Sequence, residues 1–212
     1  MINFYTKDST LKLSDEKIED RNYKSFDSGG VELEVGEFLY SMVRMLKPKH
    51  ILETGLYSGI SCMFMAEALK DNEVGSIDEV EFEPKFIANS KERLSKLGLL
   101  QYVNIYQQSS LDFNPSNNYD LILLDTEPQI RFQELVKFYP RLNDGGYLFI
   151  HDLPRSLSQG AVNTDHPEIK NWPFGDIPEQ MRLWLQEGKL RLFHLPNPRG
   201  LGGFYKTKPG DY

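Results

Sequence analysis

The feature that most constrains the fold of this chain is a regular alternation of short apolar segments with amphipathic ones. Between Val35 and Leu46 the apolar residues recur every three or four positions, as on one face of a helix, and Pro48 ends that helix. Strands that alternate with helices form βαβ units, so the pattern predicts a mostly parallel sheet with helices on both faces. The expected strands are 50–53, 74–81, 102–107, 120–124 and 147–150, the last after a turn at 143–146, and the expected helices lie around 58–70, 86–97 and 130–138.

The last third of the chain has a different pattern. A loop rich in Pro, Gly and Asn runs over residues 151–176, and Pro178 opens a helix. Two strand candidates, Leu190–Leu195 and Gly203–Lys206, close the chain and are joined by PNPRGLG. A short connection between two strands is typical of a hairpin, so we expect the sheet to end in an antiparallel pair. A loop of about 25 residues exceeds the usual connection length and indicates a functional role.

Length and composition are those of one globular domain. The chain has 212 residues, of which 40% are apolar and 26% charged, enough for one hydrophobic core. We expect a single α/β domain over residues 31–212. The polar residues 1–30 before it are expected to be irregular or to form a lid.

Charge and cysteine content restrict the partners and the compartment. The net charge of −7, with no basic stripe, argues against a nucleic-acid partner. The single cysteine, Cys62, excludes an intramolecular disulfide and indicates a reducing compartment. No stretch approaches the roughly 18 consecutive apolar residues of a membrane span, and the start has no apolar core of a signal peptide. We therefore expect a cytoplasmic protein without a membrane partner.

The most informative stretch is HILETGLYSGIS, residues 50–61, which reads as a strand end, a glycine turn and a helix start. In doubly wound folds, ligands bind at the carboxyl ends of the strands. Gly55 lets a ligand approach the backbone, and Gly59 lets the helix pack close to the strand. The first N–H groups of that helix, together with the Ser61 hydroxyl, favour a carboxylate ligand. The stretch predicts a cofactor loop.

An acidic residue follows at the end of the second expected strand. Glu81 lies 28 residues after Glu53, and a carboxylate at this position can accept both hydroxyls of a ribose. Asp78 and Glu83 compete for the role. We favour Glu81 because the next turn begins directly after it, at FEP.

Four motifs together resemble the class I S-adenosylmethionine-dependent methyltransferases, especially the catechol and caffeoyl-type O-methyltransferases. ILETGLYSGIS is similar to their first motif and VEFEP to their second. YDLILLDTEP resembles their fourth strand, and LNDGGYLFIHDL their fifth. The resemblance covers residues 35–153, and the closing hairpin also matches the family's reversed last strand. It implies a Rossmann-like fold of seven strands with S-adenosylmethionine as cofactor.

The resemblance also implies a role for each matching residue. Ser109 and Ser110 would lie at the adenine and Glu81 at the ribose. Asp125 would lie beside the sulfonium and the acceptor, with His151 and Asp152 across the mouth of the site. The methionine end of the cofactor would be held by Glu53, Gly55, Tyr57, Gly59 and Ser61.

Methyl transfer to oxygen also requires a proton acceptor or a Lewis acid. His151 suits the role of general base. Asp125 and Asp152 suit a divalent ion such as Mg²⁺, which prefers carboxylate oxygens. The chain departs here from the metal-dependent enzymes, because Leu153 stands where they usually have asparagine, and residues 126–129 offer no lysine. The pair His151–Asp152 is instead similar to bacterial sugar and natural-product O-methyltransferases. Both routes stay open.

The hypothesis that follows is methyl transfer from S-adenosylmethionine to the hydroxyl of a small molecule such as a sugar, a phenol or a natural product. The acceptor would enter between the N-terminal segment and the loop after Asp152. An amine acceptor and a homodimer stay open. One alternative is a non-catalytic module that keeps the cofactor fold. An NAD-dependent oxidoreductase is disfavoured because ETGLYSG lacks the second glycine of GxGxxG.

Overall fold

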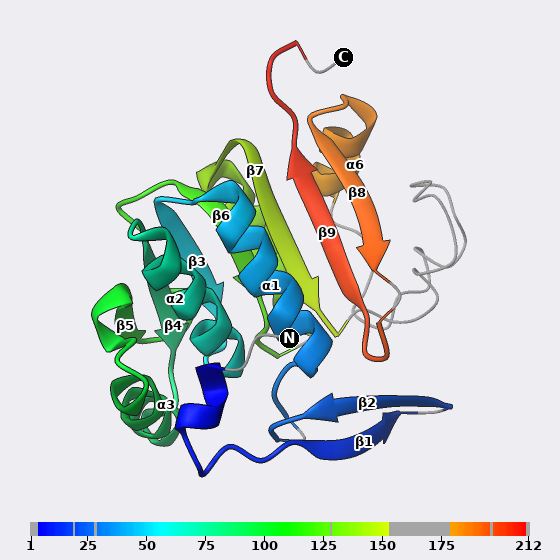
Figure 1. Cartoon of the computed structure of the whole chain (residues 1–212). Helices are drawn as coiled ribbons and strands as arrows, with labels where there is room; N and C mark the ends of the chain where they lie inside the picture. The colour runs from blue at the N-terminus through cyan, green and yellow to red at the C-terminus, as the bar shows by residue number, and fades with distance from the viewer. Residues whose placement is uncertain are drawn as a thin grey trace. The chain divides into compact units, whose positions relative to one another are not determined.

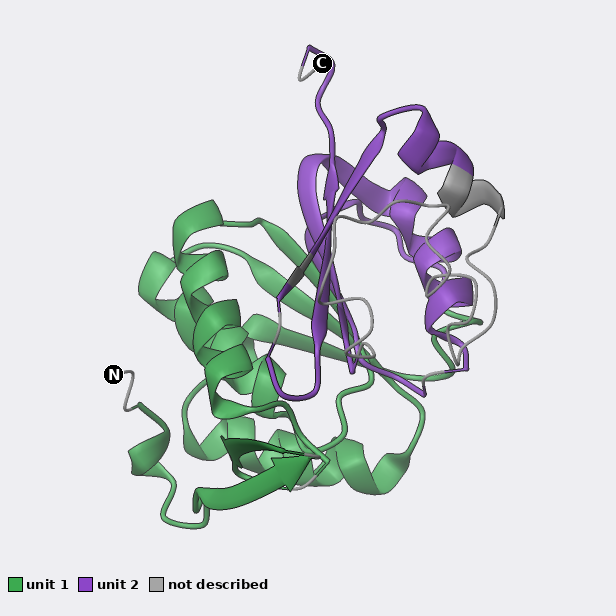
Figure 2. Cartoon of the chain, turned by 90° about the vertical axis from the view of Figure 1, so that its right-hand side faces the viewer, with its two compact units in different colours: residues 1–113 green, residues 114–212 purple. Residues whose placement is uncertain are grey.

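The computed structural model describes residues 4–18, 20–27, 29–127, 129–152, 179–195 and 197–210. The chain divides into two compact units, residues 1–113 and 114–212 (Figure 2). The division falls inside the predicted domain 31–212, whose extent stays a prediction. Most of the long loop after Asp152, including His166 and Trp172, lies outside the described residues.

The first unit is built around three parallel strands in the order β5-β4-β3 (Figure 1). Each strand and helix predicted from Val35 onward in this unit is confirmed to within about two residues, the usual disagreement at element ends. Its elements are η1 Phe4–Lys7, β1 Ser14–Ile18, β2 Arg21–Ser25, α1 Leu33–Leu46, β3 His50–Thr54, α2 Ile60–Asn72, β4 Ser76–Glu81, α3 Pro84–Lys96, η2 Leu100–Tyr102 and β5 Val103–Gln107.

Helix α2 carries much of the packing in the first unit. Every residue from Ile60 to Leu69 is buried, because α2 contacts both α1 and β4. Gly36 allows α1 to approach closely, since a Cβ at that position would lie 2.5 Å from the ring of Phe64. A helix that is apolar on every side is typical of one covered by its neighbours. The buried helix fixes the position of the glycine turn before it.

The N-terminal segment contains regular secondary structure, although the sequence led us to expect it to be irregular or to form a lid. Strands β1 and β2 pair as an antiparallel hairpin, and Phe4 of η1 packs edge-on against Phe64 with ring centroids 5.2 Å apart. Both strands are polar and largely exposed. They therefore lack the apolar alternation by which a strand is recognised in a sequence. The lid role of residues 1–30 stays a prediction.

The second unit contains four strands in the order β6-β7-β9-β8. Strands β6 and β7 are parallel, and β9 runs antiparallel to both β7 and β8. The expected closing antiparallel pair is confirmed, and its second strand is the one that lies next to β7. The elements of this unit are β6 Tyr119–Leu124, α4 Arg131–Phe138, η3 Tyr139–Arg141, β7 Leu142–His151, α6 Glu179–Gln186, β8 Leu190–Leu195 and β9 Leu201–Lys206.

Strand β7 begins earlier than predicted. Residues 143–146, expected as a turn, lie inside the strand at a register shift opposite Tyr119–Leu121 of β6. Gly145 has a φ of 80° there, a conformation that glycine adopts without steric cost. The NDGG sequence therefore interrupts the pairing of β7 with β6 without ending the strand, since the pairing resumes at Tyr147.

The two units together supply the seven strands, mostly parallel and ending in an antiparallel pair, that the family resemblance implied. The predicted Rossmann-like fold class is thus confirmed. Among the described residues, no helix is both long and apolar enough to span a membrane.

Candidate active site

The turn between β3 and α2 contains three residues with left-handed backbone conformation. Their φ angles are 88° at Gly55, 42° at Tyr57 and 74° at Gly59. The Gly55 N–H donates to the carbonyl of Val80 on β4 at 3.0 Å. A Cβ on Gly59 would lie 2.9 Å from the hydroxyl of Ser90. Both glycines are therefore required by the geometry, as expected for a turn that brings backbone close to a ligand.

Tyr57 is the one residue of this turn that reaches left-handed conformation with a large side chain. Its ring packs edge-on against Phe86 with centroids 4.7 Å apart, and it lies so close to Gly29 that a Cβ there would be 2.6 Å from the ring. The side chain remains 38% exposed. Non-glycine residues in such conformations cluster at functional sites. Tyr57 is thus available to a ligand, as its predicted role requires.

Glu81 links the end of β4 to the glycine turn. Its carboxylate accepts the Tyr57 N–H on Oε2 at 3.1 Å and the Glu83 N–H on Oε1 at 2.8 Å. A carboxylate has about four acceptor positions, so two further donors can be accommodated. The competing residue Asp78 instead accepts the amide of Asn104 on β5 at 3.1 Å. The contact with the turn favours Glu81 over Asp78 as the ribose ligand.

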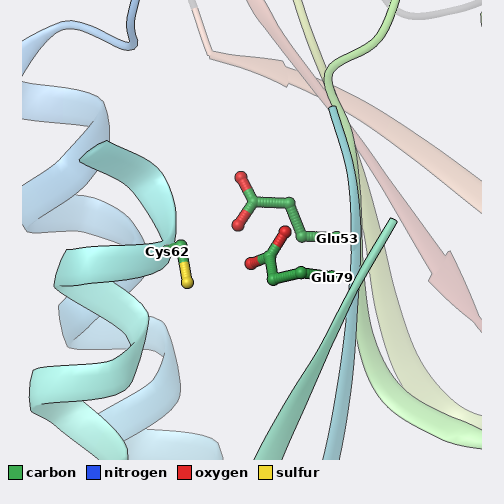
Figure 3. A group of neighbouring side chains, drawn as sticks. All are labelled: Glu53, Cys62 and Glu79. Carbon is green, nitrogen blue, oxygen red and sulfur yellow. The ribbon is translucent and has the colours of Figure 1, made fainter. Parts of the chain in front are cut away.

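Beneath the turn, Glu53 belongs to a buried cluster with Glu79 and Cys62 (Figure 3). Glu53 and Glu79 are paired in register on β3 and β4, and one ligand atom of each cluster member lies within 4.8 Å of the others. Glu53 also accepts the hydroxyl of Ser61 from the first turn of α2. Glu53 and Ser61, which were both predicted to hold the methionine end of the cofactor, are thus in contact with each other, and their cofactor role stays a prediction. Glu53 is fully buried, so it supports the turn from below.

The sequence reasoning missed Glu79. Its signal is the spacing of two between Glu79 and Glu81, which places both side chains on the same face of β4. Burial, followed by the charge of Glu53, raises the pKa of Glu79 well above its usual value. Burial likewise raises the pKa of the Cys62 thiol. Its surroundings therefore favour the protonated carboxyl of Glu79, which in that form can donate to Glu53.

Replacing Glu79 by glutamine is expected to stabilise the protein increasingly as the pH rises. The pKa of Glu79 is raised in the folded state, so its contribution to stability is full below its unfolded pKa and is lost as the pH rises toward the folded pKa. Glutamine keeps a donor beside Glu53 and does not ionise. Urea unfolding of both proteins at about pH 5 and pH 8 should show a larger advantage of the variant at the higher pH. The half-buried Glu83→Gln is the control, and an advantage of Glu79→Gln that is the same at both pH values would contradict the assignment.

The two serines predicted at the adenine follow β5. Ser109 Oγ accepts the N–H of Leu111 at 3.2 Å, and the Ser109 carbonyl accepts the N–H of Asp112. Ser110 is buried. Ser109 therefore shapes the turn after β5, and the adenine role of both residues stays a prediction.

In the second unit, the structure brings together the three residues predicted to be catalytic. Asp125 follows β6, His151 ends β7, and Asp152 comes next with a φ of 58°. His151 Nδ1 lies 3.1 Å from Asp125 Oδ1 and 3.7 Å from Asp152 Oδ1. Since β6 and β7 are parallel, their carboxyl ends meet at one edge of the sheet.

Two arginines complete this cluster, and the sequence reasoning missed both. Arg131 of α4 is 3% exposed, donates to the carbonyls of Thr126 and His151, and lies 3.2 Å from Asp125 Oδ1. Arg199 lies between β8 and β9 and binds Asp152 in a bidentate pair, Nε to Oδ1 at 2.6 Å and Nη2 to Oδ2 at 2.7 Å. The sequence offers little to identify them: Arg131 is a cation beside apolar residues of a helix, and Arg199 is a cation in a loop.

Burial, His151 and the two arginines together set the electrostatics of Asp152. Burial alone would raise the pKa of its carboxyl, but the charge of His151, the hydrogen bonds and charge of Arg199, and the charge of Arg131 together lower that pKa below its usual value. Asp152 is therefore ionised at neutral pH and fully engaged by guanidinium groups.

Known methyltransferases are similar to this chain in sequence. A family described as a methyltransferase domain matches residues 52–153. The catechol O-methyltransferase of Niastella koreensis is 28% identical over 144 residues. This match covers 64% of the chain and 63% of the relative, less than two thirds of its length.

Solved structures share the fold. The O-methyltransferase TomG from Streptomyces achromogenes, solved with S-adenosylmethionine, has a TM-score of 0.66 at 17% identity, covering 84% of this chain and 82% of that one. An O-methyltransferase from Bacillus cereus, solved with S-adenosylhomocysteine, has a TM-score of 0.67 at 15% identity, covering 85% and 84%. In sequence the chain is similar to a methyltransferase domain and to a catechol O-methyltransferase, and in fold it is similar to solved O-methyltransferases, in agreement with the predicted resemblance.

Proposed function

We propose that this protein transfers a methyl group from S-adenosylmethionine to a hydroxyl of a small molecule. The observation that carries the proposal is the contact between Glu81 and the glycine turn. It joins the residue predicted to bind the ribose to the loop predicted to bind the methionine end. The family match and the O-methyltransferase relatives support the same activity.

The cofactor roles proposed for the first unit follow from chemistry. Glu81 would accept the two ribose hydroxyls, and the glycine turn would expose backbone to the amino-acid end of the cofactor. Buried Glu53, held by Ser61, is a negative group suited to the cofactor's ammonium. When bound, S-adenosylmethionine supplies a methyl group on a sulfonium, which is a good leaving group. The protein's contribution is then alignment and proton transfer.

The second unit is proposed to supply the base. The acceptor oxygen forms the new C–O bond, the C–S bond breaks, and the hydroxyl proton passes to His151. An imidazole that donates from Nδ1 to Asp125 carries its basic lone pair on Nε2. Asp125 would stabilise the imidazolium that results, as the carboxylate does in other histidine–aspartate pairs.

The proposal includes a small-molecule acceptor, no nucleic-acid partner and a cytoplasmic location, and it leaves a homodimer open. The acceptor would be a sugar, a phenol or another natural product. The net charge of −7 supports the expected absence of a nucleic-acid partner.

The test is transfer of label from methyl-labelled S-adenosylmethionine to a panel of sugars, phenols, polyketides and matched amines. The expected result is label on an oxygen with one S-adenosylhomocysteine released per methyl. Binding of S-adenosylhomocysteine without transfer to any member would favour the non-catalytic module. Transfer to an amine alone would replace the proposed acceptor class.

His151→Gln provides the second arm. With the acceptor found in that panel, the variant is expected to lower kcat by about 10²–10⁴-fold, the usual range for loss of a general base. Its affinity for S-adenosylhomocysteine should change little, because His151 itself is not among the proposed cofactor contacts and glutamine can still donate to Asp125. An unchanged kcat would remove His151 from the mechanism.

A further inference from the structure

The carboxylates predicted to bind a divalent ion are already engaged by cations. Both oxygens of Asp152 accept hydrogen bonds from Arg199, at 2.6 and 2.7 Å. Oδ1 of Asp125 lies 3.2 Å from Arg131 and 3.1 Å from His151 Nδ1. Arg131 also lies 3.6 Å from Asp152 Oδ2. A hard cation would have to displace these donors to reach either oxygen of Asp152 or Oδ1 of Asp125.

The charges of this group balance without an ion. Two carboxylates carry −2 and two guanidinium groups carry +2, so the four side chains are neutral together. A Mg²⁺ site of the carboxylate type depends on uncompensated negative charge. Added to this group, a divalent ion would face two fixed positive charges at close range.

Arg131 is also held in place by contacts that have nothing to do with the carboxylates. Its side chain is 4% exposed and donates to the backbone carbonyls of Thr126 and His151. Removing Arg131 from the group would leave the buried carbonyl of His151 and the half-buried carbonyl of Thr126 without their donor, at an energetic cost. The residues present therefore do not fit a divalent metal ion.

We propose that Arg131 and Arg199 take the place of a metal ion, and that this site works without one. The inference rests on the proposed function. The two guanidinium groups hold Asp125 and Asp152 in fixed orientations, and proton removal falls to the side chain of His151 alone. Arg199 is a positioning residue in this scheme, since it acts through Asp152.

Metal binding is tested directly by titrating the full chain with Mn²⁺ and following the free-ion signal by electron paramagnetic resonance, with and without S-adenosylhomocysteine. The expected result is no loss of free signal up to about 1 mM Mn²⁺. The proposal would be overturned if Mn²⁺ binds below that concentration and the Asp152→Asn variant no longer binds it. This measurement does not depend on finding the acceptor.

Turnover gives the second arm. After chelation with EDTA, methyl transfer is expected to stay within about two-fold of the rate with added Mg²⁺. A loss of about ten-fold or more that Mg²⁺ restores would overturn the proposal. If no acceptor is methylated under either condition, the proposed function fails, while the Mn²⁺ titration still decides the metal.

The positioning role of Arg199 is tested by Arg199→Ala with chemical rescue. The variant is expected to lower kcat by about ten-fold or more, and millimolar guanidinium chloride should restore part of it where equal sodium chloride does not. Thermal unfolding checks that the variant is folded. Wild-type kcat in Arg199→Ala, or equal recovery with both salts, would show that Arg199 does not position the group.

Discussion

Glu81→Ala is expected to weaken binding of S-adenosylhomocysteine by about 100-fold or more. Hydrogen bonds to a charged acceptor contribute about 1.5–3 kcal/mol each, and the carboxylate is proposed to accept two from the ribose. The variant also removes the acceptor of the Tyr57 N–H, so the glycine turn loses a contact that fixes it. Isothermal titration of the wild type and the variant measures the ratio of the two dissociation constants.

Two neighbouring carboxylates serve as matched controls. Asp78→Asn keeps a partner for Asn104, and Glu83→Gln changes a side chain whose backbone N–H, not its carboxylate, contacts Glu81. Both should bind within about three-fold of the wild type if Glu81 is the ribose ligand. The assignment fails if Asp78→Asn or Glu83→Gln loses affinity while Glu81→Ala retains it. Circular dichroism of each variant shows whether the fold is kept.

Arg131→Met is expected to lower the free energy of unfolding by about 3–5 kcal/mol, the usual cost of breaking a buried ion pair on one side. Methionine fills a similar volume but leaves Asp125 without its guanidinium and the carbonyls of Thr126 and His151 without their donor. Urea unfolding followed by tryptophan fluorescence and by circular dichroism gives the change. The exposed fraction of Arg131, 3%, makes screening by solvent small.

The control for that variant is an ion pair at the surface. Lys24 pairs with Asp15 at 2.7 Å, and both side chains are largely exposed. Lys24→Met should leave the unfolding midpoint unchanged, because exposed pairs contribute little. A similarly small effect of Arg131→Met would mean that the buried cluster around Asp125 does not hold the second unit together.

The elements of the sheet could be predicted because each is encoded by neighbouring residues. The apolar run before Glu53, the glycines at 55 and 59 and the end of the strand at Glu81 are all local signals, and the structure has them at those places. The polar hairpin β1–β2 was missed for the opposite reason. Its strands, SDEKI and RNYKS, are almost entirely polar, so they carry no alternation of apolar and polar residues to read.

The sequence by itself determined the order of strands and helices, the glycine turn and the family to which these motifs point. Only the tertiary structure decided what surrounds each site residue. Arg199 lies 47 residues from Asp152, and Glu79 lies 26 residues from Glu53, yet each pair is in contact or in register. Secondary structure follows from periodicities within one segment. The charge and hydrogen bonding at a carboxylate depend on segments far apart in the chain, which meet only when the sheet has formed.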